Sequence, residues 1–130
     1  EPRVALLSHS TFGDPPNERS TPMRDAVAIL DKMGVDFEYD GEMSPDVALN
    51  AGIRALYPFC RLSGDANVLV MPGLHSTHIA TRLAHHLGGG RTIGPLLIGM
   101  EYPVQIVPMD ASVSEIVDMA GIAAYQAIVR

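Results

Sequence analysis

The chain has 130 residues, a length that favours one domain. Hydrophobic residues make up 47% and charged residues 18%, which supplies enough apolar surface for a core and excludes a disordered chain. Nine Lys and Arg against fifteen Asp and Glu give a formal charge of -6 without any basic cluster, so we expect no nucleic-acid partner. No apolar run approaches the roughly 20 residues that a membrane span takes, so we expect a soluble protein without a membrane partner.

Cysteine usage and the first residues bear on where the protein works. A lone cysteine, Cys60, cannot form an internal disulfide or a Cys-rich zinc site, which is typical of a reducing compartment. The chain begins with Glu1, and a strand-like run follows by Arg3 without the charged and apolar regions of a signal peptide. We therefore expect a cytoplasmic protein, and we interpret residues 1–130 as a single unit cut from a longer polypeptide.

The first half of the chain predicts two strands, each followed by a helix. Pro22 in a first turn and Gly34 after the last apolar residue are the usual signals for the two ends of a helix, as is Pro45 for the start of another. The predicted elements are a buried strand at Val4–Leu7, a helix from Ser20 or Thr21 to Gly34, a short strand at Phe37–Asp40 and a helix at Asp46–Leu56.

The second half predicts three strands and two helices. Ala66–Met71 is continuously apolar, as a strand buried on both faces would be. Ser112 and Glu115 have the spacing of a capping box, in which each side chain satisfies a backbone N–H of the other residue. The predicted elements are a strand at Ala66–Met71, a helix at Thr77–Leu87, short strands at Leu96–Ile98 and Val104–Val107, and a helix at Val113–Ile128.

Apolar strands that alternate with helices predict an α/β fold, a three-layer αβα sandwich with a mostly parallel sheet. Ligands of such sheets bind outside the carboxyl ends of the strands. The loops at Ser8–Phe12, Pro72–Ser76 and Gly99–Pro103 are therefore the candidate site segments.

Two of these loops carry polar groups that suit an anion. The hydroxyls and amides of Ser8–Thr11 can bind a phosphate, or they form a polar turn that satisfies its own backbone. Pro72–Thr77 joins a strand to a helix start, where free N–H groups favour an anion, or where Ser76 is simply the helix cap.

The histidines, the acidic residues and the serines each allow a catalytic and a structural interpretation. No Asp, Glu or Cys near the histidines supplies the third ligand of a catalytic zinc, so the sequence predicts no metal site. Three carboxylates either supply a base at the sheet edge or are solvated caps. No G-x-S-x-G elbow presents a nucleophilic serine. The histidines are His75, His78, His85 and His86, and the carboxylates are Asp40, Glu42 and Asp46.

Five blocks, read in chain order, resemble the phosphate acetyltransferase/butyryltransferase family. The blocks are Leu7–Gly13, Phe37–Met43, Gly64–Pro72, Leu87–Gly89 and Ile93–Gly99. Their D-G-E-[LM], A-N-V-x-[VI]-x-P and I-G-P-x-L-x-G patterns are specific in combination. The resemblance implies a phosphotransacetylase-like fold, of which this chain is the carboxy-terminal part, with CoA and the acyl phosphate in a cleft between two α/β subdomains.

The chain departs from that family at the segment where the family carries its reacting residues. By the resemblance, Pro108 and Met109 stand where the family has a serine and an arginine, Tyr102 replaces a lysine, and Glu115 falls where an aspartate would be. Methionine cannot form the bidentate contact by which arginine holds a phosphate, and proline cannot exchange a proton. The resemblance therefore implies no catalytic residue in this chain.

A transacetylase-like domain without that pair resembles the C-terminal domain of bacterial NADP-dependent malic enzymes of the two-domain type. The resemblance implies a catalytically silent domain that binds acetyl-CoA, regulates the enzyme and supports a homo-oligomer. It implies acetyl-CoA contacts by Ser10, Thr11, Tyr102 and Met109, and no cofactor in this chain. The remainder of such an enzyme converts malate to pyruvate and CO2 with NADP and a divalent metal, Mg or Mn.

Two alternatives stay open. The chain could belong to an active phosphate acetyl/butyryltransferase that moves an acyl group between CoA and phosphate. It could also serve only as a dimerisation surface, with Met100, Tyr102 and the last helix exposed to a partner.

Overall fold

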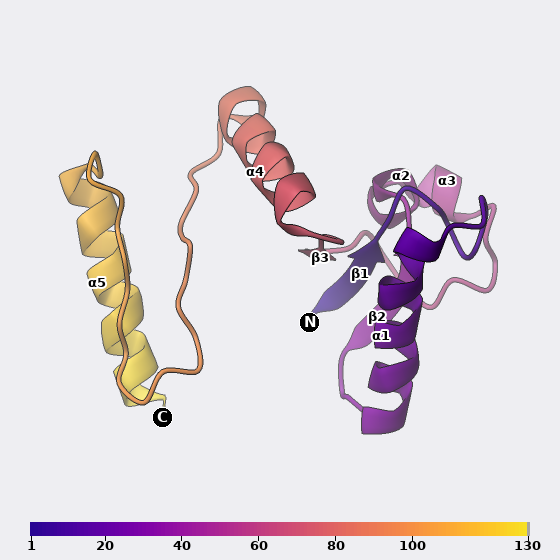
Figure 1. Cartoon of the computed structure of the whole chain (residues 1–130), viewed down its shortest axis with the longest axis horizontal. Coiled ribbons are helices and arrows are strands. Elements are labelled where there is room, and N and C mark those ends of the chain that lie inside the picture. The colour runs from indigo at the N-terminus through magenta and orange to yellow at the C-terminus, as the bar shows by residue number, and fades with distance from the viewer. Residues whose placement is uncertain (130) are drawn as a thin grey trace. The chain divides into compact units, whose positions relative to one another are not determined.

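The structure is a computed structural model that describes residues 1–129. Its contacts divide the chain into two compact units, Glu1–Ala80 and Thr81–Arg130, and the prediction of one unit over residues 1–130 stays a prediction. The elements in chain order are β1 Arg3–Leu7, the 3-10 helix η1 Glu18–Ser20, α1 Thr21–Met33, β2 Glu38–Met43, α2 Pro45–Leu49, α3 Ala51–Arg54, β3 Val68–Val70, α4 Leu74–Gly88 and α5 Val113–Ile128 (Figure 1). In the described residues, no helix is both long enough and apolar enough to cross a membrane.

The first unit is built on a parallel sheet of three strands in the order β2-β1-β3. Arg3 lies opposite Glu38 at one end of the β1–β2 pair, and Leu7 lies opposite Met43 at the other. Both neighbours of β1 run parallel to it, as the sequence predicts.

Helices cover both faces of this sheet. Along β1 the side chains alternate, so that Leu6 packs with Met23 and Val27 of α1. On the other face, Ala5 and Leu7 pack with side chains of α2 and of the segment that leads to β3. The first unit is therefore a helix–sheet–helix arrangement, and the predicted three layers are present in it.

The helix predicted at Asp46–Leu56 is wrong as one continuous element. It breaks at Asn50, whose backbone is extended with φ -134° and ψ 110°. The Asn50 side chain accepts hydrogen bonds from Gly52 N at 2.8 Å and Ile53 N at 3.2 Å, which caps α3. The preference of asparagine for an N-cap thus starts a second helix inside the segment for which the Pro45 start signal predicts a single one.

The strands predicted at Leu96–Ile98 and Val104–Val107 are also wrong, because neither segment is assigned to a strand. A strand needs a neighbour that takes up its backbone N–H and C=O groups. Here the Gln105 side chain accepts from Leu97 N at 3.1 Å and donates to Leu97 O at 3.2 Å. A side-chain amide therefore satisfies the groups that a strand partner would have bonded.

The strand predicted at Ala66–Met71 is present but shorter, and it is not buried on both faces. Val68, Leu69 and Val70 of β3 are 42%, 38% and 40% exposed, respectively. Among the described residues, none of these three side chains belongs to either hydrophobic cluster of the first unit, so the faces of this edge strand are open.

The last helix begins and ends where the sequence predicts. The Ser112 hydroxyl accepts from Glu115 N at 3.3 Å, and the Glu115 carboxylate accepts from Ser112 N at 2.7 Å. The capping box at the start of α5 is confirmed.

Gly41 allows β2 to lie close to β1, and an alanine there should destabilise the sheet. Its φ is +152°, and a Cβ atom on it would lie 2.6 Å from the carbonyl oxygen of Leu6. We expect Gly41→Ala to lower the free energy of unfolding by about 3 kcal/mol, since β1 cannot move away without losing its register. Urea denaturation measures this, with Gly73→Ala as the control because no atom lies within 4 Å of a Cβ there. A loss in Gly41→Ala no larger than in the control would contradict the assignment.

The capping box should make the stability of α5 depend on pH. Hydrogen bonds from the Ser112 side chain and then from its backbone lower the pKa of the Glu115 carboxyl. A lowered pKa stabilises the fold above the ordinary Glu value of about 4.3, and the contribution is lost as the pH falls through the folded-state pKa. We expect Ser112→Ala to reduce the helical circular dichroism signal and the urea midpoint at pH 7, and to change them less at pH 3. An effect of equal size at both pH values would mean that Glu115 has no part in the cap.

Candidate functional site

The loop after β1 folds around one residue of β2. Phe12 N donates to the backbone oxygen of Glu42 at 2.8 Å, and Gly13 N donates to the Glu42 side chain at 3.0 Å. The backbone of Thr11 forms a tight turn with Asp14, through bonds of 2.8 and 3.1 Å. The predicted site loop is therefore held against the carboxyl end of the sheet by Glu42.

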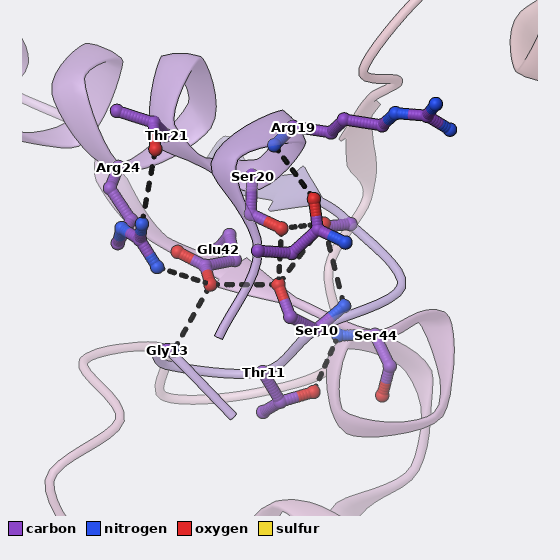
Figure 2. A network of polar contacts seen from close by, with 11 residues as sticks. Ser10, Thr11, Gly13, Arg19, Ser20, Thr21, Arg24, Glu42 and Ser44 are labelled. Atoms are coloured by element: carbon purple, nitrogen blue, oxygen red, sulfur yellow. Dashed lines mark hydrogen bonds and ion pairs between the residues drawn. The ribbon is translucent and has the colours of Figure 1, made fainter. Parts of the chain in front are cut away.

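Glu42 is fully buried and serves as an acceptor for three groups. Its Oε1 accepts from Ser10 Oγ at 2.8 Å, from Gly13 N at 3.0 Å and from the Arg24 guanidinium at 3.2 Å (Figure 2). Its other oxygen, Oε2, has no hydrogen-bond partner among residues 1–129. The cost of burying a carboxylate is offset when a positive charge and hydrogen bonds stabilise it. In Glu42 all of these stabilising contacts are made to Oε1.

Three buried serine hydroxyls extend this network. Ser10 Oγ lies 2.5 Å from Ser20 Oγ, and Ser8 Oγ lies 3.0 Å from Ser20 Oγ. Ser20 is therefore engaged with the loop and makes no side-chain cap at α1, although the sequence makes it a cap candidate. The 3-10 turn η1, which runs into α1, replaces that cap.

Ser10 and Thr11, the two predicted acetyl-CoA contacts in this unit, are both buried, at 0% and 9% exposure. The Ser10 hydroxyl donates to Glu42, and the Thr11 hydroxyl accepts from Ser44 N at 3.0 Å. Both side chains thus stabilise the loop. A ligand bound at this loop would contact mainly its backbone and the side chains of neighbouring residues.

Tyr102 and Met109, the other two predicted contacts, belong to the second unit. Both side chains are exposed, Tyr102 at 72% and Met109 at 106%. A shallow pocket of about 270 Å³ lies in the same unit, and its lining includes neither of them. Its lining residues are Leu97, Ile98, Gly99, Met100, Pro103, Gln126 and Val129. The four residues stay a prediction for the acetyl-CoA site.

The acidic residues near the sheet edge are less solvated than an ordinary acidic turn. Asp40 is 5% exposed and accepts from Arg61 N at 2.8 Å and from the Arg61 guanidinium at 3.3 Å. Arg61 also pairs with Asp31, where the Tyr39 hydroxyl and then Arg61 lower the pKa of the carboxyl. The interpretation as solvated caps is therefore wrong for Asp40 and for Glu42, while Asp46 lies exposed in the first turn of α2.

Two hydroxyl side chains in the first turn of α4 bond to the backbone just before the helix. Ser76 Oγ and Thr77 Oγ1 both donate to Gly73 O, at 2.8 and 2.9 Å. Ser76 lies inside α4 and is not its cap, which corrects the expectation. Among residues 1–129, no group of three or more His, Cys, Asp or Glu side chains could hold a metal ion.

One arginine of the second unit lies beside a serine and a carboxylate. The Arg91 guanidinium donates to Ser114 Oγ at 3.1 Å and also contacts the carboxylate of Asp118. The Arg91 side chain is 63% exposed, so the group is open to solvent.

The Glu42 network should dominate the stability of the first unit. We expect Glu42→Ala to lower the free energy of unfolding by about 3 kcal/mol, because the buried Ser10 hydroxyl and Gly13 N–H lose their acceptor. Glu42→Gln keeps an oxygen at that place and should cost about 1 kcal/mol. Urea denaturation of both variants checks this, and equal losses for the two would show that the acceptor is not what matters.

The chain is similar to proteins named NADP-dependent malic enzyme and to proteins named phosphate acetyltransferase. An NADP-dependent malic enzyme of Rhizobium meliloti (strain 1021) is 60% identical over 126 residues, which cover 97% of this chain and 17% of that protein. A phosphate acetyltransferase of Paracoccus denitrificans is 39% identical over 97% of this chain and 40% of that protein. The chain thus spans less than half the length of either relative.

Solved structures agree with the fold. A phosphotransacetylase from Streptococcus pyogenes superposes with a TM-score of 0.92 at 34% identity, over 99% of this chain and 40% of that chain. EutD phosphotransacetylase from Staphylococcus aureus superposes with a TM-score of 0.88 at 33% identity, over 97% of this chain and 40% of its own. The predicted phosphotransacetylase-like α/β fold is confirmed. Since the profile described as phosphate acetyl/butaryl transferase matches residues 1–124, the chain belongs to that family.

Proposed function

We propose that this chain is the C-terminal regulatory and oligomerisation domain of a cytoplasmic NADP-dependent malic enzyme, and that it binds acetyl-CoA without transferring its acyl group. Three relatives named NADP-dependent or probable NADP-dependent malic enzyme support this parentage, at 60%, 48% and 40% identity. In this proposal the remainder of the polypeptide carries out the oxidative decarboxylation of malate with NADP and a divalent metal.

The observation that carries the silent role is the pair Pro108 and Met109. By the resemblance, these residues stand where the family has its serine and arginine. Met109 is fully exposed, and its thioether is only a weak acceptor, so it cannot donate to a phosphoryl oxygen. Proline has no exchangeable proton to give or take. The chemistry of acyl transfer to phosphate therefore lacks two of its groups at that segment.

Two of the proposed acetyl-CoA contacts lie in the first unit and two in the second. In the first, the loop that contains Ser10 and Thr11 lies at the carboxyl end of β1, which is the usual place for a ligand in a parallel sheet. In the second, Tyr102 and Met109 have exposed side chains. Exposed apolar residues of α5, among them Val117 and Ile128, support the oligomerisation part of the proposal.

A second function, active acyl transfer, is favoured by one observation. Arg91 contacts Ser114 and Asp118, so the residue types that the family uses occur together in the second unit. The relative from Paracoccus denitrificans bears the name phosphate acetyltransferase. In this alternative Arg91 would hold the phosphate and Ser114 would take part in the reaction.

Inhibition by acetyl-CoA tests the regulatory proposal. A ligand regulates only when it binds one state of the enzyme more tightly than another. We expect a malic enzyme that carries this chain to be inhibited by acetyl-CoA, and a version without residues 1–130 to lose at least about 10-fold in sensitivity, the size of a typical coupling. The KM for malate is the control for an intact catalytic part. Equal inhibition of both proteins would refute the proposal.

Release of CoA from acetyl-CoA in the presence of phosphate separates the two functions. The proposal expects no release above background from the same full protein. Release that disappears in Arg91→Gln but persists in Arg82→Gln, a change on the exposed face of α4, would establish the second function.

A further inference from the structure

We propose that Arg24, Thr21 and Asn17 form a binding site for a phosphoryl group on the first unit, and that this site takes a phosphate of CoA. The identity of the ligand as CoA rests on the proposed function, whereas the phosphoryl chemistry follows from the residues themselves. None of the three residues belongs to the predicted acetyl-CoA contacts.

These residues line one pocket. It has a volume of about 290 Å³ and lies between the loop after β1 and the first turn of α1. Pockets for whole drug-sized ligands are about 300–1,000 Å³ and enclose most of the ligand. This pocket lies at the lower end of that range and is open to solvent, so a phosphate or pyrophosphate group can enter it. The lining residues are Pro16, Asn17, Glu18, Thr21 and Arg24.

Arg24 has donors to spare, and its position is fixed. Its NH1 donates to Glu42 at 3.2 Å and its NH2 donates to Thr21 Oγ1 at 3.2 Å, which leaves three of the five N–H groups of the guanidinium. The side chain is 39% exposed, so these N–H groups are accessible. Because Glu42 Oε1 also accepts from Ser10 and Gly13, its charge is shared among several donors. Arginine held in this way suits bidentate contact with phosphoryl oxygens.

The other two polar groups also offer donors. Thr21 Oγ1 accepts from Arg24, so the proton of its hydroxyl is available to a ligand. Asn17 Oδ1 accepts from Arg19 N at 2.7 Å, which turns that oxygen away from a ligand and leaves the amide NH2. A site made of a guanidinium, a hydroxyl and an amide NH2 recognises acceptor oxygens.

Glu18 is the one negatively charged residue among the lining residues of this pocket. Its removal should therefore change the affinity for an anion in the opposite direction to removal of Arg24. The Glu18 side chain is exposed, so water and salt reduce its repulsion of an anion. Removal of this charge should strengthen phosphate binding, whereas removal of the Arg24 charge should weaken it.

The experiment measures dissociation constants of the full chain by isothermal titration calorimetry with inorganic pyrophosphate, inorganic phosphate, acetyl-CoA, CoA and dephospho-CoA. The variant R24Q/E42Q removes both charges of the Arg24–Glu42 ion pair and leaves no unpaired carboxylate, while R24K keeps the charge and loses the fork geometry. R19Q is the matched control. It removes a positive charge near the pocket, and the Arg19 side chain points away from the network (Figure 2). Circular dichroism confirms that each variant is folded.

We expect R24Q/E42Q to weaken pyrophosphate and CoA binding by about 10- to 100-fold, the usual size for loss of charge-assisted hydrogen bonds. R24K should lie between it and the native chain, E18Q should bind up to about 5-fold more tightly, and R19Q should change little. If a variant unfolds, R24K and E18Q still decide the question, because neither leaves Glu42 unpaired. Weaker binding of dephospho-CoA than of CoA would assign the site to the 3'-phosphate, and equal binding would assign it to the pyrophosphate.

The outcomes separate this inference from the proposed function. Native affinity for CoA or pyrophosphate in R24K and R24Q/E42Q would overturn the phosphoryl site and leave the proposed function standing. Binding of pyrophosphate that depends on Arg24, without any binding of acetyl-CoA, would establish the site and refute the proposed function. A native chain that binds none of these five ligands would overturn both.

Discussion

A carboxylate buried at the end of a strand is costly unless donors surround it, and in this chain Glu42 accepts from three donors that belong to two different elements. Ser10 and Gly13 come from the loop after β1, and Arg24 comes from α1. Glu42 Oε1 accepts from all three donors. Only one arrangement of the loop, α1 and β2 brings these donors to that oxygen. The shape of the carboxyl end of the sheet follows from this single side chain.

Local signals predicted the elements whose ends are set by neighbouring residues. β1, α1 and α5 occur where apolar spacing and caps place them, and the Ser112 capping box is formed. The failures come from side chains that bond to backbone groups. Asn50 breaks the helix predicted at Asp46–Leu56, and Gln105 occupies backbone groups of Leu97, eight residues earlier in the chain. The spacing of apolar residues indicates which face of a helix or strand is buried, but it does not indicate hydrogen bonds between a side chain and the backbone.

The candidate site was only partly accessible to sequence reasoning. Position after a strand points to Ser10 and Thr11 as candidate contacts, but it does not show that their hydroxyls are used within the fold. The sequence leaves Glu42 as either a base at the sheet edge or a solvated cap, because the predicted strand ends at Asp40, whereas β2 continues to Met43 and buries Glu42. Arg24 lies 18 residues from Glu42, and nothing in the spacing of the two residues indicates that they meet.

Helix α1 forms ion pairs at both of its ends, and it supplies the positive charge at one end and the negative charge at the other. Near its start the helix supplies the cation, Arg24, to Glu42 of β2; near its end it supplies the anion, Asp31, to Arg61, which in turn holds Asp40 of β2. A shift of the helix by one turn in either direction along the strand would separate opposite charges at both ends at once. The ion pairs at the two ends therefore act together with the apolar contacts of α1 in fixing the axial register between helix and sheet.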